Sequence, residues 1–269
     1  MKKVLILLIF LILILSIPQK TAELTINWDT DYKDKKIYQW VENPQEIIDT
    51  STIVQIQKKE ENSIRWWEYP DTIYPTKRNG DDLLVLVNKQ YKLPSSYAPK
   101  DLVKASKSGI RRGENYYLRN IVIPDLTRMI TDAKLEGVDL SIVSGYRSYQ
   151  TQIDTYNYWL KMNNGNTNLV DTFSARAGHS QHQLGTAIDF STNEIRDKLG
   201  DEFSNTKASK WLSQNAYKYG FVISYPKGYE NITGYKHESW HYRYIGVENA
   251  KSMLNSREIL ELYLRSYNL

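Results

Sequence analysis

All four histidines of the 269-residue chain lie between residues 179 and 241. Two of them, His182 and His241, combine with Asp189 into a set of two imidazoles and one carboxylate. Three such ligands are typical of a hydrolytic zinc site, because the tetrahedral ion then keeps one position open for water. Glu238 precedes His241 by three residues, close enough to act as a base without binding the metal. The spacing therefore indicates metal-assisted hydrolysis.

The segment between His182 and Asp189 favours a tight turn. Gly185 and Ala187 remove side-chain bulk there, so the backbone can bring the two candidate ligands to one point. The chain has no cysteine. That excludes disulfides, thiolate zinc sites and cysteine nucleophiles, so any metal must be held by histidine and carboxylate side chains.

Four separated motifs resemble the VanY-type zinc D-alanyl-D-alanine carboxypeptidases, which share a group with the VanX dipeptidases and the hedgehog zinc domain. In chain order the motifs are Leu86-Val-Asn-Lys89 with Leu93-Pro94 and Tyr97-x-Pro99, Ser144-Gly-Tyr-Arg-Ser-Tyr-x-x-Gln152, Ser180-x-His182-x-x-Gly185-x-Ala187-x-Asp189, and Glu238-x-Trp240-His241. The resemblance covers residues 83–269 and leaves out residues 1–82. Gln181 stands where the family often has Glu, a change with no clear catalytic consequence. His179 and His237 occupy positions that the family does not require.

The resemblance implies a role for each residue of the candidate metal site. His182, Asp189 and His241 would bind zinc, which is the expected cofactor. Glu238 would act first as the general base and then as the general acid, passing a proton to the leaving amine.

The resemblance also implies a substrate and the residues that bind it. Arg147 would stabilise the oxyanion or hold the terminal carboxylate, and Ser180 and Gln152 would help to hold the peptide end. The expected reaction removes the C-terminal D-alanine from cell-wall stem peptides. An L,D-carboxypeptidase and a peptidoglycan endopeptidase stay open as alternatives. A non-catalytic wall-binding module is a further alternative, but the intact Glu238 argues against it.

A serine acyl-enzyme would act on the same substrate, and its short motifs also occur. Ser-x-x-Lys is found at Ser204–Lys207 and at Ser224–Lys227. The sequence Lys107-Ser-Gly109 precedes both of them, which reverses the chain order expected for such enzymes. Zinc chemistry is therefore the favoured hypothesis.

Short apolar runs and helical periodicity predict the elements that must position these residues. Strands are expected at Leu83–Val87, Leu140–Val143, Thr186–Phe190, Phe221–Ser224 and Trp240–Ile245. Helices are expected from near Pro124 to Leu135, and over Gln150–Met162, Ser209–Tyr219 and Glu248–Tyr263. Because no regular βαβ rhythm is present, we expect an α+β fold. It would be a small, mainly antiparallel sheet flanked by helices, with the zinc site at one edge.

The first residues have the pattern of an export signal. Lys2 and Lys3 precede the apolar run Val4–Ile17, which is shorter than the ~20 residues of a usual spanning helix. We therefore expect residues 1–19 to be a signal peptide or a membrane anchor and the protein to act outside the cytoplasm. Residues 20–82 would be a spacer or small N-terminal subdomain with a strand at Ser51–Gln57. Residues 83–269 would form the zinc carboxypeptidase domain.

Composition narrows the choice of partners. The chain has 41% hydrophobic residues, which excludes disorder throughout. Its 35 basic and 31 acidic residues leave a net charge of +4, and no recognisable nucleic-acid module is present. The basic tract Lys104–Arg112 is interpreted as a solvated face, and contact with an anionic wall polymer or membrane surface stays open as the alternative. We expect peptidoglycan stem peptides as partners, the bacterial membrane through the N-terminal segment if that segment is not cleaved, and no nucleic acid.

Overall fold

A four-stranded antiparallel sheet lies at the centre of the computed structural model, which describes residues 65–268. The predicted signal or anchor and the strand predicted at Ser51–Gln57 lie outside these residues. The strand order is β5-β6-β8-β7. The strands are β5 (Ser141–Ser144), β6 (Ala187–Ser191), β7 (Phe221–Ile223) and β8 (His241–Tyr244). Four of the predicted strands are thus confirmed within one or two residues, and with them the α+β class.

Two smaller strand pairs lie beside this sheet. A parallel pair joins β1 (Tyr74–Pro75) to β2 (Tyr91–Lys92), and an antiparallel pair joins β3 (Leu102–Lys104) to β4 (Tyr117–Arg119). Strand β1 precedes residue 83, where the sequence predicts the start of the zinc domain. That boundary stays a prediction.

The helices flank the central sheet. They are α3 (Ile123–Leu135), α4 (Tyr149–Met162), α5 (Thr167–Val170), α6 (Lys207–Asn215), α7 (Glu230–Thr233), α8 (Val247–Ser256) and α9 (Leu260–Tyr267). Helix α3 carries Pro124 in its first turn, as predicted. The single helix predicted over Glu248–Tyr263 is wrong. Arg257 adopts a left-handed φ of 58° and separates α8 from α9, and both helices then bury apolar side chains in one cluster.

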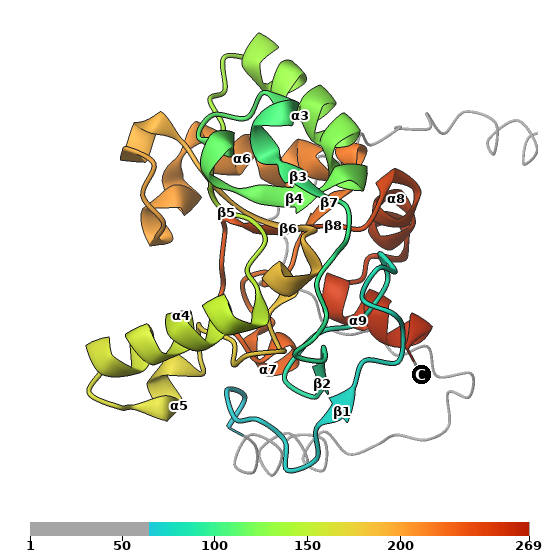
Figure 1. The fold of residues 1–269 in the computed structure, drawn as a ribbon. Helices are drawn as coiled ribbons and strands as arrows, with labels where there is room; N and C mark the ends of the chain where they lie inside the picture. The colour runs from blue at the N-terminus through green and yellow to red at the C-terminus, as the bar shows by residue number, and fades with distance from the viewer. Residues whose placement is uncertain (1–64, 269) are drawn as a thin grey trace, which may run out of the picture.

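The two faces of the sheet differ in chemistry. On β6, Ile188 and Phe190 point into the main hydrophobic core together with Tyr242 from β8. Helices α3 and α6 cover this face, while α4, α5, α7 and α9 lie on the other side of the sheet (Figure 1). Because side chains alternate along a strand, Asp189 and His241 project from the face opposite the main core. The sheet therefore presents the candidate ligands away from the apolar layer.

In the apolar run Leu83–Val87 the last three residues are buried and the first two are half-buried, but the run is not a strand. Its peptide groups are satisfied by side chains. Arg243 donates from Nη2 to the carbonyl oxygens of Leu83 and Val85, at 3.0 and 2.7 Å. The side chain of Asn268 donates to the carbonyl oxygen of Leu84 and accepts from the amide of Leu86. These bonds replace the ladder that a strand would need, so the segment is buried without pairing with the sheet.

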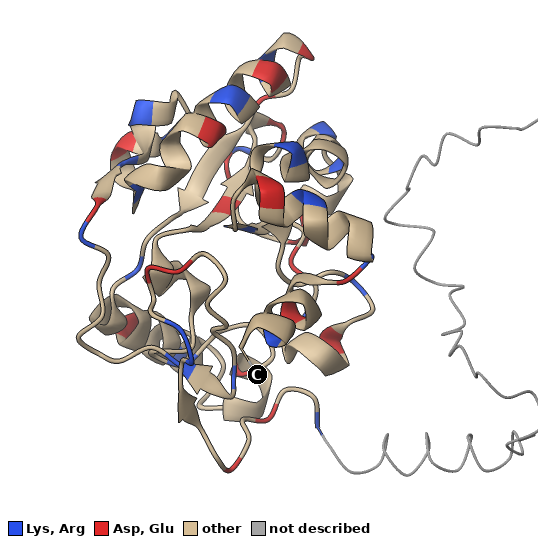
Figure 2. Ribbon diagram, turned by 90° about the vertical axis from the view of Figure 1, so that its right-hand side faces the viewer, with Lys and Arg blue, Asp and Glu red and all other residues tan. Residues whose placement is uncertain are grey.

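Charged residues of both signs are interspersed over the described part of the chain, as Figure 2 shows. Such mixing agrees with the small net charge of +4. Between residues 65 and 268, no helix has the length and apolar character needed to cross a bilayer.

Candidate active site

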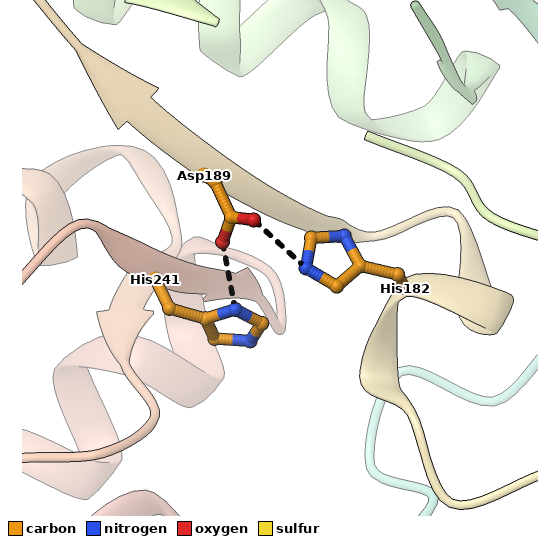
Figure 3. A group of neighbouring side chains, drawn as sticks. All are labelled: His182, Asp189 and His241. Carbon is orange, nitrogen blue, oxygen red and sulfur yellow. Dashed lines mark hydrogen bonds and ion pairs between the residues drawn. The ribbon is translucent and has the colours of Figure 1, made fainter. Parts of the chain in front are cut away.

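Two histidines and one aspartate converge on the face of the sheet that is opposite the main core. The ligand atoms of His182, Asp189 and His241 lie within 4.8 Å of one another, and all three residues are buried. Asp189 lies in the middle of β6 and pairs in register with His241, the first residue of β8. His182 lies on a 3₁₀-helix, Gln181–Leu184. In Figure 3 the carboxylate of Asp189 lies between the two rings.

The turn after His182 requires the glycine that follows the 3₁₀-helix. Gly185 has a φ of 68°, in the left-handed region that favours glycine. A Cβ there would lie 3.0 Å from Cγ of Arg119 and 3.1 Å from a methyl group of Leu102. At the other end of the 3₁₀-helix, the hydroxyl of Ser180 accepts a bond from the amide of His182 at 3.3 Å. The turn at Gly185 and the cap at Ser180 thus hold the backbone that carries His182.

Hydrogen bonds at the far sides of the rings assign their tautomers. Nδ1 of His182 donates to the carbonyl of Gly145 at 2.7 Å, which leaves Nε2 as a lone pair. This Nε2 is buried, has no hydrogen-bond partner among the described residues, and lies 3.2 Å from Oδ2 of Asp189. Nε2 of His241 donates to Oε1 of Gln181 at 3.2 Å, so Nδ1 is the lone pair that lies 2.9 Å from Oδ1 of Asp189.

Three acceptor groups therefore face one another without a proton between them. In a dry interior this arrangement is repulsive unless a cation lies at its centre. Each imidazole also donates its other N–H to an oxygen, which is the usual support for a metal-binding histidine. The donor set fits zinc.

Glu238 lies next to this group without joining it. Its Oε2 is 3.7 Å from Nδ1 of His241, and its side chain is 12% exposed. Burial and the nearby Asp189 raise the pKa of Glu238 well above its usual value, while Arg147 opposes them. A carboxyl group with a raised pKa can both accept and return a proton near neutral pH, as general acid–base catalysis requires.

Arg147 reaches the same centre from the loop before α4. Its Nη2 lies 3.7 Å from Oδ2 of Asp189, and its Nη1 donates to Oε1 of Gln152 at 2.9 Å. Gln152 is buried and donates in turn to the carbonyl of Ala175 at 2.6 Å. Ser148 caps α4 by accepting a bond from the amide of Thr151. The Ser-Gly-Tyr-Arg-Ser motif thus starts a helix and directs a guanidinium towards the three candidate ligands His182, Asp189 and His241, which are called the metal group from here on.

A cleft of about 1150 Å³ opens over this centre. Every site residue predicted from the sequence lines it: Arg147, Gln152, Ser180, His182, Asp189, Glu238 and His241. The structure therefore brings together the whole predicted set.

Sequence reasoning missed two neighbours of His241. Oε1 of Gln181 accepts from both His241 and the hydroxyl of Ser224, the latter at 2.7 Å. The residue that replaces the family's Glu therefore orients a candidate ligand. The ring of Tyr225 packs against that of His241, with their centroids 5.0 Å apart. Only the departure from the family pattern at residue 181 could have drawn attention to either contact.

The other two histidines stay outside the metal group. His179 packs edge-on against Tyr69 and bonds through Nδ1 to the carbonyl of Asn88. Burial lowers its pKa to about 4, which keeps the ring neutral. His237 bonds through Nδ1 to the carbonyl of Tyr225 at 2.9 Å.

The role of Gln181 leads to a measurable prediction. Replacing Gln181 by Ala removes the acceptor that orients His241, and we expect zinc affinity to fall by about 10–100-fold. Gln181→Glu keeps an acceptor and should bind zinc at least as tightly as the wild type. Gln183, on the same turn, bonds to the carbonyls of Pro94 and Tyr97 and serves as the control. Competition with a chromogenic chelator measures all three variants. Equal affinity of Gln181→Ala and Gln183→Ala would contradict the role.

Comparison with known proteins agrees with this site. The VanY family, described as D-alanyl-D-alanine carboxypeptidase, matches residues 115–247. The protein YodJ of Bacillus subtilis (strain 168) is 40% identical over 190 residues, which are 70% of this chain and 69% of YodJ. The solved LdcB LD-carboxypeptidase is 35% identical with a TM-score of 0.65, and the match covers 75% of this chain and 95% of LdcB.

A second solved structure shows the metal. It is the vancomycin resistance D,D-pentapeptidase VanY from a VanB-type cassette, in a mutant form with Zn(II). That chain is 31% identical with a TM-score of 0.56, and the match covers 67% of this chain and 98% of VanY. Fold and site together define a zinc metallopeptidase. The chain belongs to the VanY family of D-alanyl-D-alanine carboxypeptidases.

Proposed function

We propose that this protein is a zinc-dependent peptidoglycan carboxypeptidase that removes the C-terminal D-alanine from stem peptides ending in D-Ala-D-Ala. One observation carries the proposal most directly. Three unprotonated donors converge beside Glu238, whose pKa is raised, in a cleft large enough for a peptide end. The family description as D-alanyl-D-alanine carboxypeptidase supports the choice of substrate.

Under this proposal His182, Asp189 and His241 hold the zinc ion. A zinc ion bound there would supply Lewis-acid polarisation of the scissile carbonyl and lower the pKa of water. Glu238 takes the proton of the attacking water and delivers it to the amine of the leaving D-alanine. Its position 3.7 Å from His241 supports this role, because a proton acceptor must lie within reach of the water without filling the position that water needs.

The remaining predicted residues bind and orient the substrate. Arg147 places a fixed positive charge near the carbonyl oxygen on which negative charge develops. Alternatively, it holds the terminal carboxylate of the peptide, which is charged from the start. Gln152 holds that guanidinium in place through the 2.9 Å bond to Nη1. Ser180 lines the cleft and would contact the peptide end. Because its hydroxyl also accepts from the amide of His182, it would link substrate binding to the metal group.

A second candidate is an L,D-carboxypeptidase, which would cut the last bond of tetrapeptides. The LdcB LD-carboxypeptidase has the higher TM-score of the two solved relatives, 0.65 against 0.56 for VanY. The chemistry at the metal would be the same, since the two reactions differ in the configuration of the residue before the cut.

Mass spectrometry of defined muropeptides separates these reactions. The zinc-loaded protein is incubated with a pentapeptide ending in D-Ala-D-Ala, a tetrapeptide, and a cross-linked dimer. We expect the pentapeptide to lose one alanine and the other two to stay intact. Chelator-treated protein is the control. Loss of alanine from the tetrapeptide alone would favour the L,D reaction, and separation of the dimer would favour an endopeptidase.

We also propose that the domain acts outside the cytoplasmic membrane, tethered or secreted into the cell wall. Its expected substrate is there, and Lys2 and Lys3 before the apolar run favour an N-terminus that stays inside. A protease added to intact protoplasts should digest the domain. Full protection until the protoplasts are lysed would contradict this location.

A further inference from the structure

One face of helix α4 lines the cleft far beyond the metal group. The helical residues on this face are Thr151, Gln152, Asp154, Thr155, Tyr158 and Trp159. Their spacing of three, four and seven residues makes a continuous stripe along the helix. At the inner end Gln152 holds Arg147, which lies beside Asp189. The stripe therefore runs from the metal centre towards solvent.

The outer end of the stripe is aromatic and unusually exposed. Tyr158 is 54% exposed and Trp159 is 37% exposed. The ring centroids of Tyr158 and Trp159 are 5.1 Å apart. Trp159 also makes an edge-on contact with Phe173, with 5.5 Å between the centroids. Phe173 also lines the cleft. Three aromatic rings in contact at the mouth of a binding cleft are typical of a ligand-binding wall, whereas single exposed apolar side chains need no such explanation.

The length of the stripe indicates what would reach these rings. Gln152 and Trp159 are seven residues apart, which corresponds to about 10 Å along a helix. An extended peptide covers about 3.3 Å per residue, so three residues span the same distance. A peptide whose last bond lies at the metal group and which follows α4 would therefore meet Tyr158 and Trp159 about three residues before that bond.

We propose that Tyr158, Trp159 and Phe173 form a subsite for the stem peptide about three residues upstream of the bond that is cut. This inference rests on the proposed function and adds a preference for long stem peptides over short D-Ala-D-Ala compounds. Burial of apolar peptide surface against the rings would supply binding energy that a dipeptide cannot use, because it ends before it reaches them.

The test compares Trp159→Ala with a matched control on the same helix. Met162 is 60% exposed and does not line the cleft, so Met162→Ala should change nothing. Trp159→Phe, which keeps an aromatic ring, guards against a folding defect. The substrates are N-acetyl-D-Ala-D-Ala, the free pentapeptide, and the pentapeptide attached to muramic acid. We expect Trp159→Ala to lower kcat/KM for both pentapeptides by about tenfold, mainly through KM, and to leave the short compound unaffected.

Three results would overturn the proposal. An equal loss on all three substrates would mean that Trp159 supports the site as a whole. A loss confined to the muramic acid compound would assign the rings to the sugar. No loss on any substrate would leave the rings without a role in binding.

A binding measurement keeps this inference separate from the proposed function. Calorimetry with the free pentapeptide compares the Glu238→Ala protein with the Glu238→Ala/Trp159→Ala protein. We expect binding to be about tenfold weaker in the double variant, whichever bond the enzyme cuts. Equal binding would reject the subsite, whereas absence of cleavage by the wild-type protein would reject only the proposed function.

Discussion

Replacing Glu238 by Ala is expected to leave bound zinc near the wild-type level while turnover falls by about 10²–10⁴-fold. The carboxylate lies 3.7 Å from His241 and outside the group of three converging donors, so its loss should not open the metal site. It should remove only the proton transfer from water to the leaving amine. Burial is the chief cause of the raised pKa of Glu238, which suits the residue to accept a proton and to return it.

Metal content and cleavage rate must be measured on the same preparation. Glu238→Gln, which keeps the size of the side chain, should behave like Glu238→Ala. Glu248 is 87% exposed on α8 and supplies the control, since Glu248→Ala should keep full activity. If zinc were lost in step with activity, Glu238 would be a ligand. If the wild-type rate persisted, the residue would have no part in the reaction.

Much of the central sheet could be predicted from the sequence, because short apolar or alternating stretches mark its strands. Pro124 similarly marks the start of α3 within one residue. The strand predicted at Leu83–Val87 failed for a reason that lies far away in the sequence. Leu83–Val87 has the composition of a buried strand, but Arg243 and Asn268 satisfy its peptide groups, and they lie 158 to 184 residues away along the chain. The local sequence around Leu83–Val87 cannot indicate hydrogen-bond partners that are so far away along the chain.

The metal group was predictable for a different reason. His182, Asp189 and His241 share a chemistry that few other combinations in a chain without cysteine could provide, and the motif spacing matches a known family. What could not be predicted is the support around these residues. The carbonyl of Gly145 and the side chain of Gln181 fix the two tautomers. Neither residue type suggests that role by itself, since it depends on how three distant segments meet.

Removing a zinc ligand should lower zinc affinity more than removing a residue that only orients a ligand. We expect His182→Ala to lower zinc affinity by more than the about 10–100-fold expected when a residue that orients a ligand is lost. Two donors would remain, and both would face the open position left by the imidazole. Turnover should fall together with zinc content, in contrast to the Glu238 variant.

Thermal unfolding with and without added zinc provides a readout independent of activity. A ligand that binds only the folded protein stabilises it by about 2.7 kcal/mol when its concentration is 100 times Kd. The wild-type protein should therefore gain stability with zinc, and His182→Ala should gain little at the same concentration. His179 is the matched control, because it is also buried but lies outside the metal group. His179→Ala should lose basal stability through its contact with Tyr69 and still respond fully to zinc. An undiminished zinc response in His182→Ala would show that the metal is held elsewhere.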